Sequence, residues 1–103
     1  MDRFHEMQVF LAVAEEEGFA AAARRLNTSP PSVTRAIAAM EARIGTQLLA
    51  RTTRSLHLTE AGQRYLEDCR RILAELDAVQ LNLDQLSAHL RQLHKDAGGI
   101  ELP

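Results

Sequence analysis

Aromatic residues, cysteine and long apolar runs are scarce in this chain of 103 residues. It contains three phenylalanines, one tyrosine, no tryptophan and a single cysteine, Cys69. One cysteine excludes an intramolecular disulfide and a zinc site built from several cysteines. No apolar run approaches the roughly 18 residues of a membrane span, and the opening MDRFHEM places charges where a secretory signal needs an apolar segment. The sequence therefore predicts a soluble cytoplasmic protein with an aliphatic core and no membrane contact.

The sequence also lacks the motifs that are typical of catalytic sites and metal sites. The four histidines (His5, His57, His89, His94) show no metal-ligand spacing. There is no Ser-His-Asp order, no glycine-rich phosphate loop and no suggestion of a paired-carboxylate site. Cys69 is expected to be a buried thiol rather than a nucleophile, and the acids of the first helix are expected to form a solvated face. We therefore expect no enzymatic activity, no cofactor and no bound metal.

Positive charge is concentrated in the middle of the chain, although the net charge is −2. Residues 1–18 have a net charge of −4 and residues 59–103 of −3, whereas residues 19–58 hold six arginines against Glu41, a net +5. Local rather than total charge governs binding to phosphate. The basic segment can be a nucleic-acid footprint or a chance surface patch, and charge alone does not choose between them.

The stretch 28–45, TSPPSVTRAIAAMEARIG, predicts a helix with one buried face and one open face. Ser29 is suited to cap its N-terminus, Pro30 and Pro31 are tolerated in the first turn, and Gly45 is suited to end it. The apolar stripe consists of Val33, Ile37, Met40 and Ile44. The opposite face is small or polar and consists of Ser32, Thr34, Arg35, Ala38 and Ala39. Such a helix suits the major groove of DNA.

The preceding residues predict two further helices. Apolar spacings of three and four indicate a first helix over residues 3–16, Gly18 breaks it, and residues 20–26 form a short alanine-rich helix. Asn27 and Thr28 then form a tight turn into the central helix. A short helix, a turn and a second helix are typical of a helix-turn-helix. The alternative is an ordinary helical corner in a three-helix bundle.

The hydrophobic period changes after Gly45. Residues 47–50 and 56–58 predict two short strands, and the polar, basic RTTRS lies between them. The hairpin is interpreted as a wing, with Arg51 and Arg54 near its tip, reaching the DNA backbone or minor groove. The alternative is a solvated loop without function.

A long helix is predicted from Thr59, a suitable N-cap, to about residue 95. Its apolar residues alternate at four and three and are Tyr65, Cys69, Ile72, Leu76, Val79, Leu83, Leu86, Leu90 and Leu93. This strict 3.5-residue period predicts packing along one seam. At 1.5 Å per residue the helix is roughly 55 Å long, which a domain of 58 residues cannot cover. We therefore expect it to meet a second copy of itself.

Specific motifs in one register carry a family resemblance. F-x-x-A-A-x-x-L is matched by Phe19, Ala22, Ala23 and Leu26. S-x-P-x-V-[ST]-x-x-I-x-x-L-E-x-x-x-G is matched by Ser29, Pro31, Val33, Thr34, Ile37, Met40 (for the usual Leu), Glu41 and Gly45. The remaining matches are Leu48, Leu49 and Arg51 to L-F-x-R, with Leu49 for Phe, and Leu58, Thr59, Ala61 and Gly62 to L-T-x-A-G. With these motifs, residues 1–80 resemble the N-terminal domain of LysR-type bacterial transcription regulators.

The resemblance implies a winged helix-turn-helix that binds double-stranded operator DNA as a dimer, with antiparallel linker helices. Carried over by position, the residues facing bases or nearby phosphates are Pro30, Pro31, Ser32, Thr34 and Arg35, and those of the wing are Arg51, Thr53 and Arg54. Ser29 and the helix N-terminus are expected to anchor a phosphate. Pro30 replaces a frequent Gln, so readout there should depend on apolar contact, for example with a thymine methyl.

The predicted organisation is a mainly α-helical chain of three parts. Residues 1–58 form the winged helix-turn-helix, residues 59–95 the linker and dimerisation helix, and residues 96–103 a short tail. Family members continue into a ligand-binding domain, so this chain is expected to carry no small-molecule effector site, whether it is a truncated piece or a naturally short regulator. The rival hypothesis is an interaction module that pairs with a full-length regulator without specific DNA binding of its own.

Overall fold

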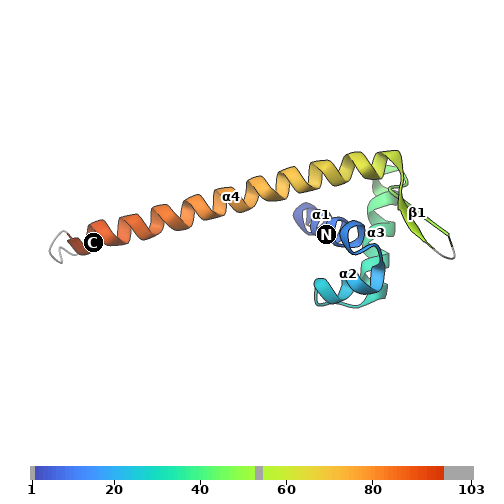
Figure 1. Cartoon of the computed structure of the whole chain (residues 1–103), viewed down its shortest axis with the longest axis horizontal. Coiled ribbons are helices and arrows are strands. Elements are labelled where there is room, and N and C mark those ends of the chain that lie inside the picture. Colours follow the sequence, from blue (N-terminus) through green and yellow to red (C-terminus); the bar gives the residue numbers. More distant parts are fainter. Residues whose placement is uncertain (1, 53–54, 97–103) are drawn as a thin grey trace. The chain divides into compact units, whose positions relative to one another are not determined.

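The computed structural model describes residues 2–52 and 55–96, which form four helices and a two-stranded hairpin (Figure 1). The chain divides into two compact units, Met1–Leu73 and Ala74–Pro103. Both the mainly helical class and the winged helix-turn-helix predicted from the sequence are confirmed. The first unit extends past the expected boundary at residue 58, because Leu66 and Cys69 are buried in its core.

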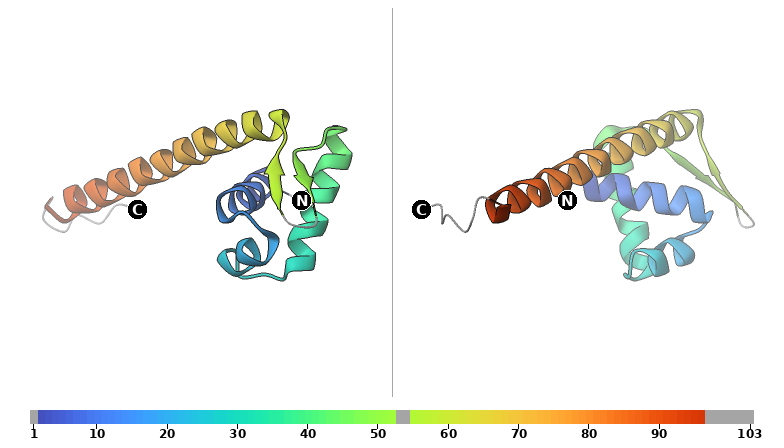
Figure 2. Two further views of the ribbon diagram at one scale, coloured as in Figure 1. Left: turned by 45° about the vertical axis from the view of Figure 1, so that its right-hand side comes forward. Right: turned by 60° about the vertical axis from the view of Figure 1, so that its left-hand side comes forward.

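Three helices build the body of the first unit, and they cluster together in both views of Figure 2. They are α1 (Arg3–Glu16), α2 (Phe19–Arg25) and α3 (Pro30–Ile44). Local chemistry explains the ends of α1, since the Asp2 carboxylate accepts a hydrogen bond from the Phe4 N–H (3.1 Å) and Glu17 turns left-handed (φ 58°). The short helix begins one residue earlier than expected, and α1 spans the predicted range.

A mainly aliphatic core, with the aromatic ring of Phe10 buried inside it, holds these helices together. Its fully buried larger side chains are Phe10, Val13, Val33, Ile37, Met40 and Cys69. Buried alanines on α1, α2 and α3 allow the helices to approach closely. The ring of Tyr65 packs on Phe10, with centroids 4.9 Å apart and planes tilted by 59°.

The wing consists of β1 (Leu49–Arg51) and β2 (Leu56–Leu58), an antiparallel pair in which Leu49 faces Leu58 and Arg51 faces Leu56. The sequence predicts the first strand over residues 47–50, and in the structure it begins later. One oxygen of the Glu41 carboxylate accepts the Leu48 and Leu49 N–H groups (2.6 and 3.1 Å). A side chain of α3 therefore binds the backbone N–H groups at the start of β1 and fixes the base of the wing.

Thr59 links the wing to α4 (Glu60–Asp96). Its hydroxyl donates to the Gln47 carbonyl (2.7 Å) and accepts from the Gly62 N–H (3.0 Å), while its own N–H donates to the Leu48 carbonyl (3.0 Å). The predicted N-cap is thus confirmed. Gly62 is buried at this point, and a Cβ there would overlap the Leu48 carbonyl oxygen. Only glycine lets the first turn of α4 lie against this backbone.

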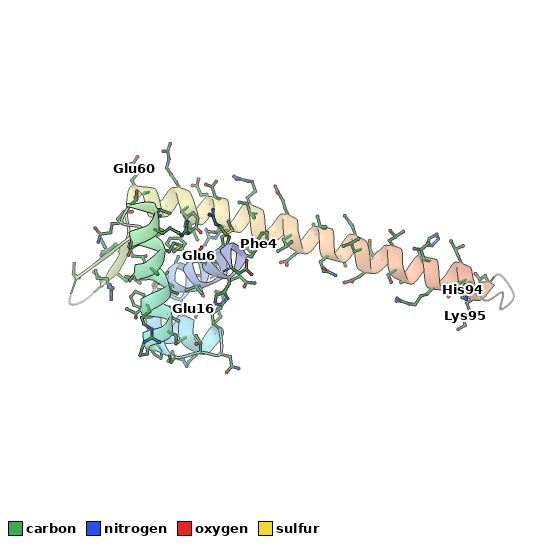
Figure 3. The ribbon with its side chains drawn as sticks, turned by 180° about the vertical axis from the view of Figure 1, so that it is seen from behind. Phe4, Glu6, Glu16, Glu60, His94 and Lys95 are labelled. Atoms are coloured by element: carbon green, nitrogen blue, oxygen red, sulfur yellow. The ribbon has the colours of Figure 1, made fainter. Side chains whose placement is uncertain are left out.

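The described part of the second unit is the remainder of α4. Intrahelical hydrogen bonds join side chains four residues apart, as in Gln80–Asp84 (3.1 Å) and Ser87–Arg91 (2.8 Å). Basic residues occupy the last turn, where Figure 3 labels His94 and Lys95, and they complement the helix dipole. Of the predicted tail, only Asp96 lies within the described residues.

Candidate nucleic-acid interface

The N-terminus of α3 is capped by its own chain. Ser29 is extended (φ −97°, ψ 149°), and its hydroxyl accepts the Ser32 N–H (3.3 Å) and lies 2.8 Å from the Ser32 hydroxyl. Pro30 and Pro31 have no N–H, and the Val33 N–H donates to the Ser29 carbonyl (3.2 Å). The Ser32 and Val33 N–H groups are therefore bonded within the chain. The anchoring of a phosphate by Ser29 and the helix N-terminus stays a prediction, with the Ser29 and Ser32 hydroxyls as the side-chain groups available for it.

The side chains of α3 divide between two faces as predicted. Val33, Ala36, Ile37 and Met40 are buried. The opposite face is open: Ser32 and Thr34 are partly exposed, and the exposed residues are Pro30, Pro31, Arg35, Ala38 and Ala39. We call these seven residues the α3 polar face. Ile44, expected on the apolar stripe, is 43% exposed because it lies at the last turn of the helix.

Two side chains of this face are already oriented within the helix. The Thr34 hydroxyl donates to the Pro30 carbonyl (3.0 Å), a bond typical of threonine in helices. This bond occupies the only donor of the Thr34 side chain. The Arg35 guanidinium donates to the Ser32 hydroxyl at 3.4 Å, and no carboxylate of the described residues pairs with it. Its other N–H groups remain available to an acceptor such as a guanine edge.

Arg51, the last residue of β1, lies over an aromatic ring. Its guanidinium carbon is 4.7 Å from the centroid of Phe19, the first residue of α2. Beyond it, Thr52 and Ser55 bond to each other, with the Thr52 N–H donating to the Ser55 carbonyl (2.9 Å). The predicted wing residues Thr53 and Arg54 lie outside the described residues.

Part of the basic charge of residues 19–58 is neutralised within the first unit. Arg25 pairs with Glu15 and Glu16 (2.9 and 3.3 Å), and Glu15 also pairs with Arg70 on α4 (3.2 Å). Hydrogen bonding from Arg25 lowers the pKa of Glu15, and Glu15 raises the pKa of Arg25. These acids are therefore partners of arginines as well as solvated groups.

Arg43 is likewise paired, and its partner corrects a sequence expectation. It donates to both carboxylate oxygens of Glu6 (2.9 and 3.0 Å), where α1 and α3 meet (Figure 3). Glu6 is only 7% exposed, so it does not belong to a solvated face. Burial of this charge is possible because the guanidinium pairs with it. Among the described arginines of the basic segment, Arg24, Arg35 and Arg51 have no carboxylate partner.

The residues predicted for the seam of α4 divide into two groups. Cys69 is fully buried and Tyr65 partly buried in the core of the first unit, and Ile72 is partly exposed. Cys69 therefore offers no surface to a partner. Large exposed apolar side chains, each 41–55% exposed, follow on one face at spacings of three and four and are Leu76, Val79, Leu83, Leu86, Leu90 and Leu93. We call these six residues the α4 stripe.

The Cys69 thiol is expected to resist alkylation in the folded protein. Burial raises its pKa to about 11, and only the thiolate reacts readily. Mass spectrometry after iodoacetamide treatment at neutral pH should show unmodified protein, whereas the same treatment in concentrated guanidinium chloride should add one carbamidomethyl group. Equal labelling rates in both solvents would contradict the burial of this side chain.

Metal-binding clusters and membrane-spanning helices are both absent from the described part of the chain. Within residues 2–52 and 55–96, no group of three or more His, Cys, Asp or Glu side chains is placed to hold a metal ion. Across those residues, too, no helix combines the length and apolar character that crossing a bilayer requires.

Several known proteins are similar to this chain in sequence and in fold. Residues 4–63 match the family model described as bacterial regulatory helix-turn-helix protein, lysR family. The HTH-type transcriptional regulator TcbR of Pseudomonas sp. (strain P51) is 50% identical over 70 residues, which are 68% of this chain and 24% of TcbR. The uncharacterized HTH-type transcriptional regulator YnfL of Escherichia coli (strain K12) is 46% identical over 80 residues, 78% of this chain and 27% of YnfL. The chain thus spans about a quarter of the length of these relatives.

Two similar solved structures contain DNA. The CbnR_DBD–DNA complex has a TM-score of 0.72 and 44% identity, and the match covers 84% of this chain and 99% of that one. The BenM_DBD/catB site 1 DNA complex has a TM-score of 0.80 and 28% identity, and the match covers 84% and 97%. In both cases the similar part is a separate DNA-binding domain.

Proposed function

Because the chain belongs to the lysR family of bacterial regulatory helix-turn-helix proteins, we propose that it binds specific sequences of double-stranded DNA as a homodimer, or a higher oligomer, and regulates transcription. The observation that carries the proposal is the α3 polar face, open to solvent on a helix whose other face is buried. The proposal places the protein in the bacterial cytoplasm, at the nucleoid, and includes no catalytic step and no cofactor.

The α3 polar face supports recognition in the major groove. Arg35 and Thr34 are the residues assigned to bases, and Ser29 and Ser32 supply hydroxyls for a nearby phosphate. Since the Thr34 hydroxyl donates to Pro30 within the helix, its methyl group is left for apolar contact with thymine. Pro30 and Pro31 give the N-terminal end of this face an apolar and rigid surface. CbnR_DBD and BenM_DBD, which share this fold, are seen in complexes with DNA.

The wing supplies sequence-independent contacts. Arg51 has no carboxylate partner among the described residues and is assigned to the DNA backbone or minor groove, together with Thr53 and Arg54, which lie outside those residues. A chain with a net charge of −2 can still bind phosphate if some of its arginines have no carboxylate partner. Among the described residues of the basic segment these are Arg24, Arg35 and Arg51. Their charge is local, while the acids of α1 neutralise Arg25 and Arg43.

The α4 stripe supports pairing of two chains. Its side chains repeat at the spacing of a coiled-coil seam, and each is about half exposed in the single chain. A contiguous apolar surface of this kind marks a protein interface. Pairing two copies joins two α3 helices in one particle, as an operator with two half-sites requires.

Arg35→Ala is expected to relax sequence discrimination. A bidentate contact from arginine to guanine is worth ~1–3 kcal/mol of discrimination, so the ratio of affinities for a target duplex and its single-base variants should shrink by that amount at one position. The measurement is competition binding across a panel of single-base variants. Arg91→Ala, which removes an exposed arginine of the second unit, should leave every ratio unchanged. Equal ratios for wild type and Arg35→Ala would remove Arg35 from base recognition.

The proposal is tested by selecting duplexes from a random library with the 103-residue chain. The affinity of the selected duplex is then compared with that of a scrambled duplex by fluorescence anisotropy at several salt concentrations. We expect the selected duplex to bind at least ~10³-fold more tightly, and the affinity for both duplexes to fall as salt rises. Absence of enrichment, with equal binding to both duplexes, would reject specific recognition.

That negative outcome would favour the second candidate function, a dimerisation module that pairs with a full-length regulator. The observation favouring it is the α4 stripe, which is exposed independently of any DNA contact. Under this second candidate function we expect mixed dimers with a longer family member and weak binding to every duplex. The two candidates therefore differ in the anisotropy experiment and share the prediction of pairing.

A further inference from the structure

Four arginines of the first unit show two different ways of holding a guanidinium. Arg25, Arg43 and Arg70 each donate N–H groups to carboxylates, at 2.9–3.3 Å. Arg51 instead lies over the Phe19 ring, 4.7 Å from its centroid, and no acidic side chain of the described residues pairs with it. An ion pair engages the N–H donors of a guanidinium with carboxylate oxygens, whereas a cation–π contact leaves those donors without an oxygen acceptor. The donors of Arg51 thus remain available.

The contact also restricts a side chain that would otherwise be mobile. A free arginine side chain samples many rotamers, and Arg51 is exposed at the end of β1. Phe19 is itself partly buried, packs against the hydrophobic core and begins α2. The guanidinium is therefore held by a ring that the core keeps in place.

We propose that Phe19 is a positioning residue for DNA binding: its ring holds the Arg51 guanidinium with its N–H donors free for a backbone phosphate. The inference rests on the proposed function and goes beyond it, because it assigns a role in binding to an aromatic residue of α2 that acts through Arg51 rather than by touching DNA. Arranging the guanidinium before binding reduces the entropy lost when the phosphate is contacted.

Four proteins test the proposal as a double-mutant cycle: wild type, Phe19→Leu, Arg51→Ala and the double variant. Their affinities for the selected duplex are measured by anisotropy across a range of salt concentrations. We expect Arg51→Ala to weaken binding and to lower the salt slope by about 0.9, the value for one lost phosphate contact. Phe19→Leu should weaken binding about threefold to tenfold. It should also lower the salt slope, as Arg51→Ala does. In the Arg51→Ala background, Phe19→Leu should have no further effect.

Two additional variants separate positioning from packing. Phe19→Tyr keeps an aromatic face and should bind as wild type does. Leu11→Ala removes a partly buried side chain that packs on the same core from α1 and should lower the thermal midpoint while leaving the salt slope unchanged.

The contradicting outcomes are distinct. If Phe19→Leu weakens binding equally with and without Arg51, or leaves the slope unchanged, the ring acts through folding and the inference fails while the proposed function stands. The inference fails in the same way if Arg51→Ala changes neither affinity nor slope. If wild type does not prefer the selected duplex, the proposed function fails and this inference fails with it.

Discussion

Gly62→Ala is expected to destabilise the first unit by about 2–3 kcal/mol, the upper range for overpacking a filled site. The added Cβ would overlap the Leu48 carbonyl oxygen, and backbone cannot rotate away as a side-chain tip can. The same carbonyl accepts the Thr59 N–H, so displacing it also strains the cap of α4. The measurement is urea denaturation followed by circular dichroism at the helix minimum.

Gly18→Ala is the matched control. Gly18 is extended (φ 177°), and a Cβ there would have nothing within 4 Å. Replacing glycine by alanine at the N-cap of α2 should cost about 0.5–1 kcal/mol, which is clearly less than the cost expected for Gly62→Ala. Similar unfolding midpoints for the two alanine variants would contradict the close packing of α4 against Leu48.

The double substitution Leu83→Glu, Leu86→Glu is expected to produce monomers and to weaken DNA binding by about 100-fold or more. Two carboxylates on the α4 stripe would be desolvated without partners if the seam formed. A monomer loses the gain in affinity of about 10²–10⁴ that comes from engaging two half-sites together. Sedimentation velocity measures the first effect, and anisotropy with the selected duplex measures the second.

The double variant Gln85→Glu, Ala88→Glu places the same charges at exposed positions of α4 off the stripe. It should sediment and bind DNA as wild type does. If both double variants remain dimeric, the α4 stripe is not the contact between chains. If the stripe variant is monomeric but binds the duplex with undiminished affinity, pairing is not required for recognition.

Features of α3 can be predicted from the sequence because they are local. Capping by Ser29, tolerance of Pro30 in the first turn and termination at Gly45 all depend on neighbours within one helical turn, and the structure confirms each. The presence of two faces follows from the helical period. The engagement of the Thr34 hydroxyl with Pro30 is also within reach, since threonine commonly bonds four residues back.

Contacts between distant residues cannot be predicted in this way. The pairs Glu6–Arg43 and Arg51–Phe19 join segments far apart in the sequence, and neither has a local pattern. Glu41 can be matched to a motif, yet its role in fixing the base of the wing follows only from its bonds to the Leu48 and Leu49 N–H groups. The charge count is therefore a poor guide to which arginines remain available.

The beginning of α4 shows a second limit of periodicity. The 3.5-residue repeat predicts one seam from Tyr65 onward, but the structure buries Leu66 and Cys69 in the core of the first unit. A helix with two apolar faces gives overlapping repeats, and the period alone does not say which face is covered by the same chain. The exposed fraction of each side chain shows which face the same chain covers. The proposed dimer contact is therefore restricted to the α4 stripe.

In the proposed complex, two chains joined through the α4 stripe place two α3 helices on one duplex. Native mass spectrometry of the 103-residue chain with the selected duplex tests it most directly. We expect a complex of two chains per duplex, formed without a populated complex of one chain per duplex. A stable complex of a single chain on that duplex, at concentrations where the free protein is monomeric, would contradict it.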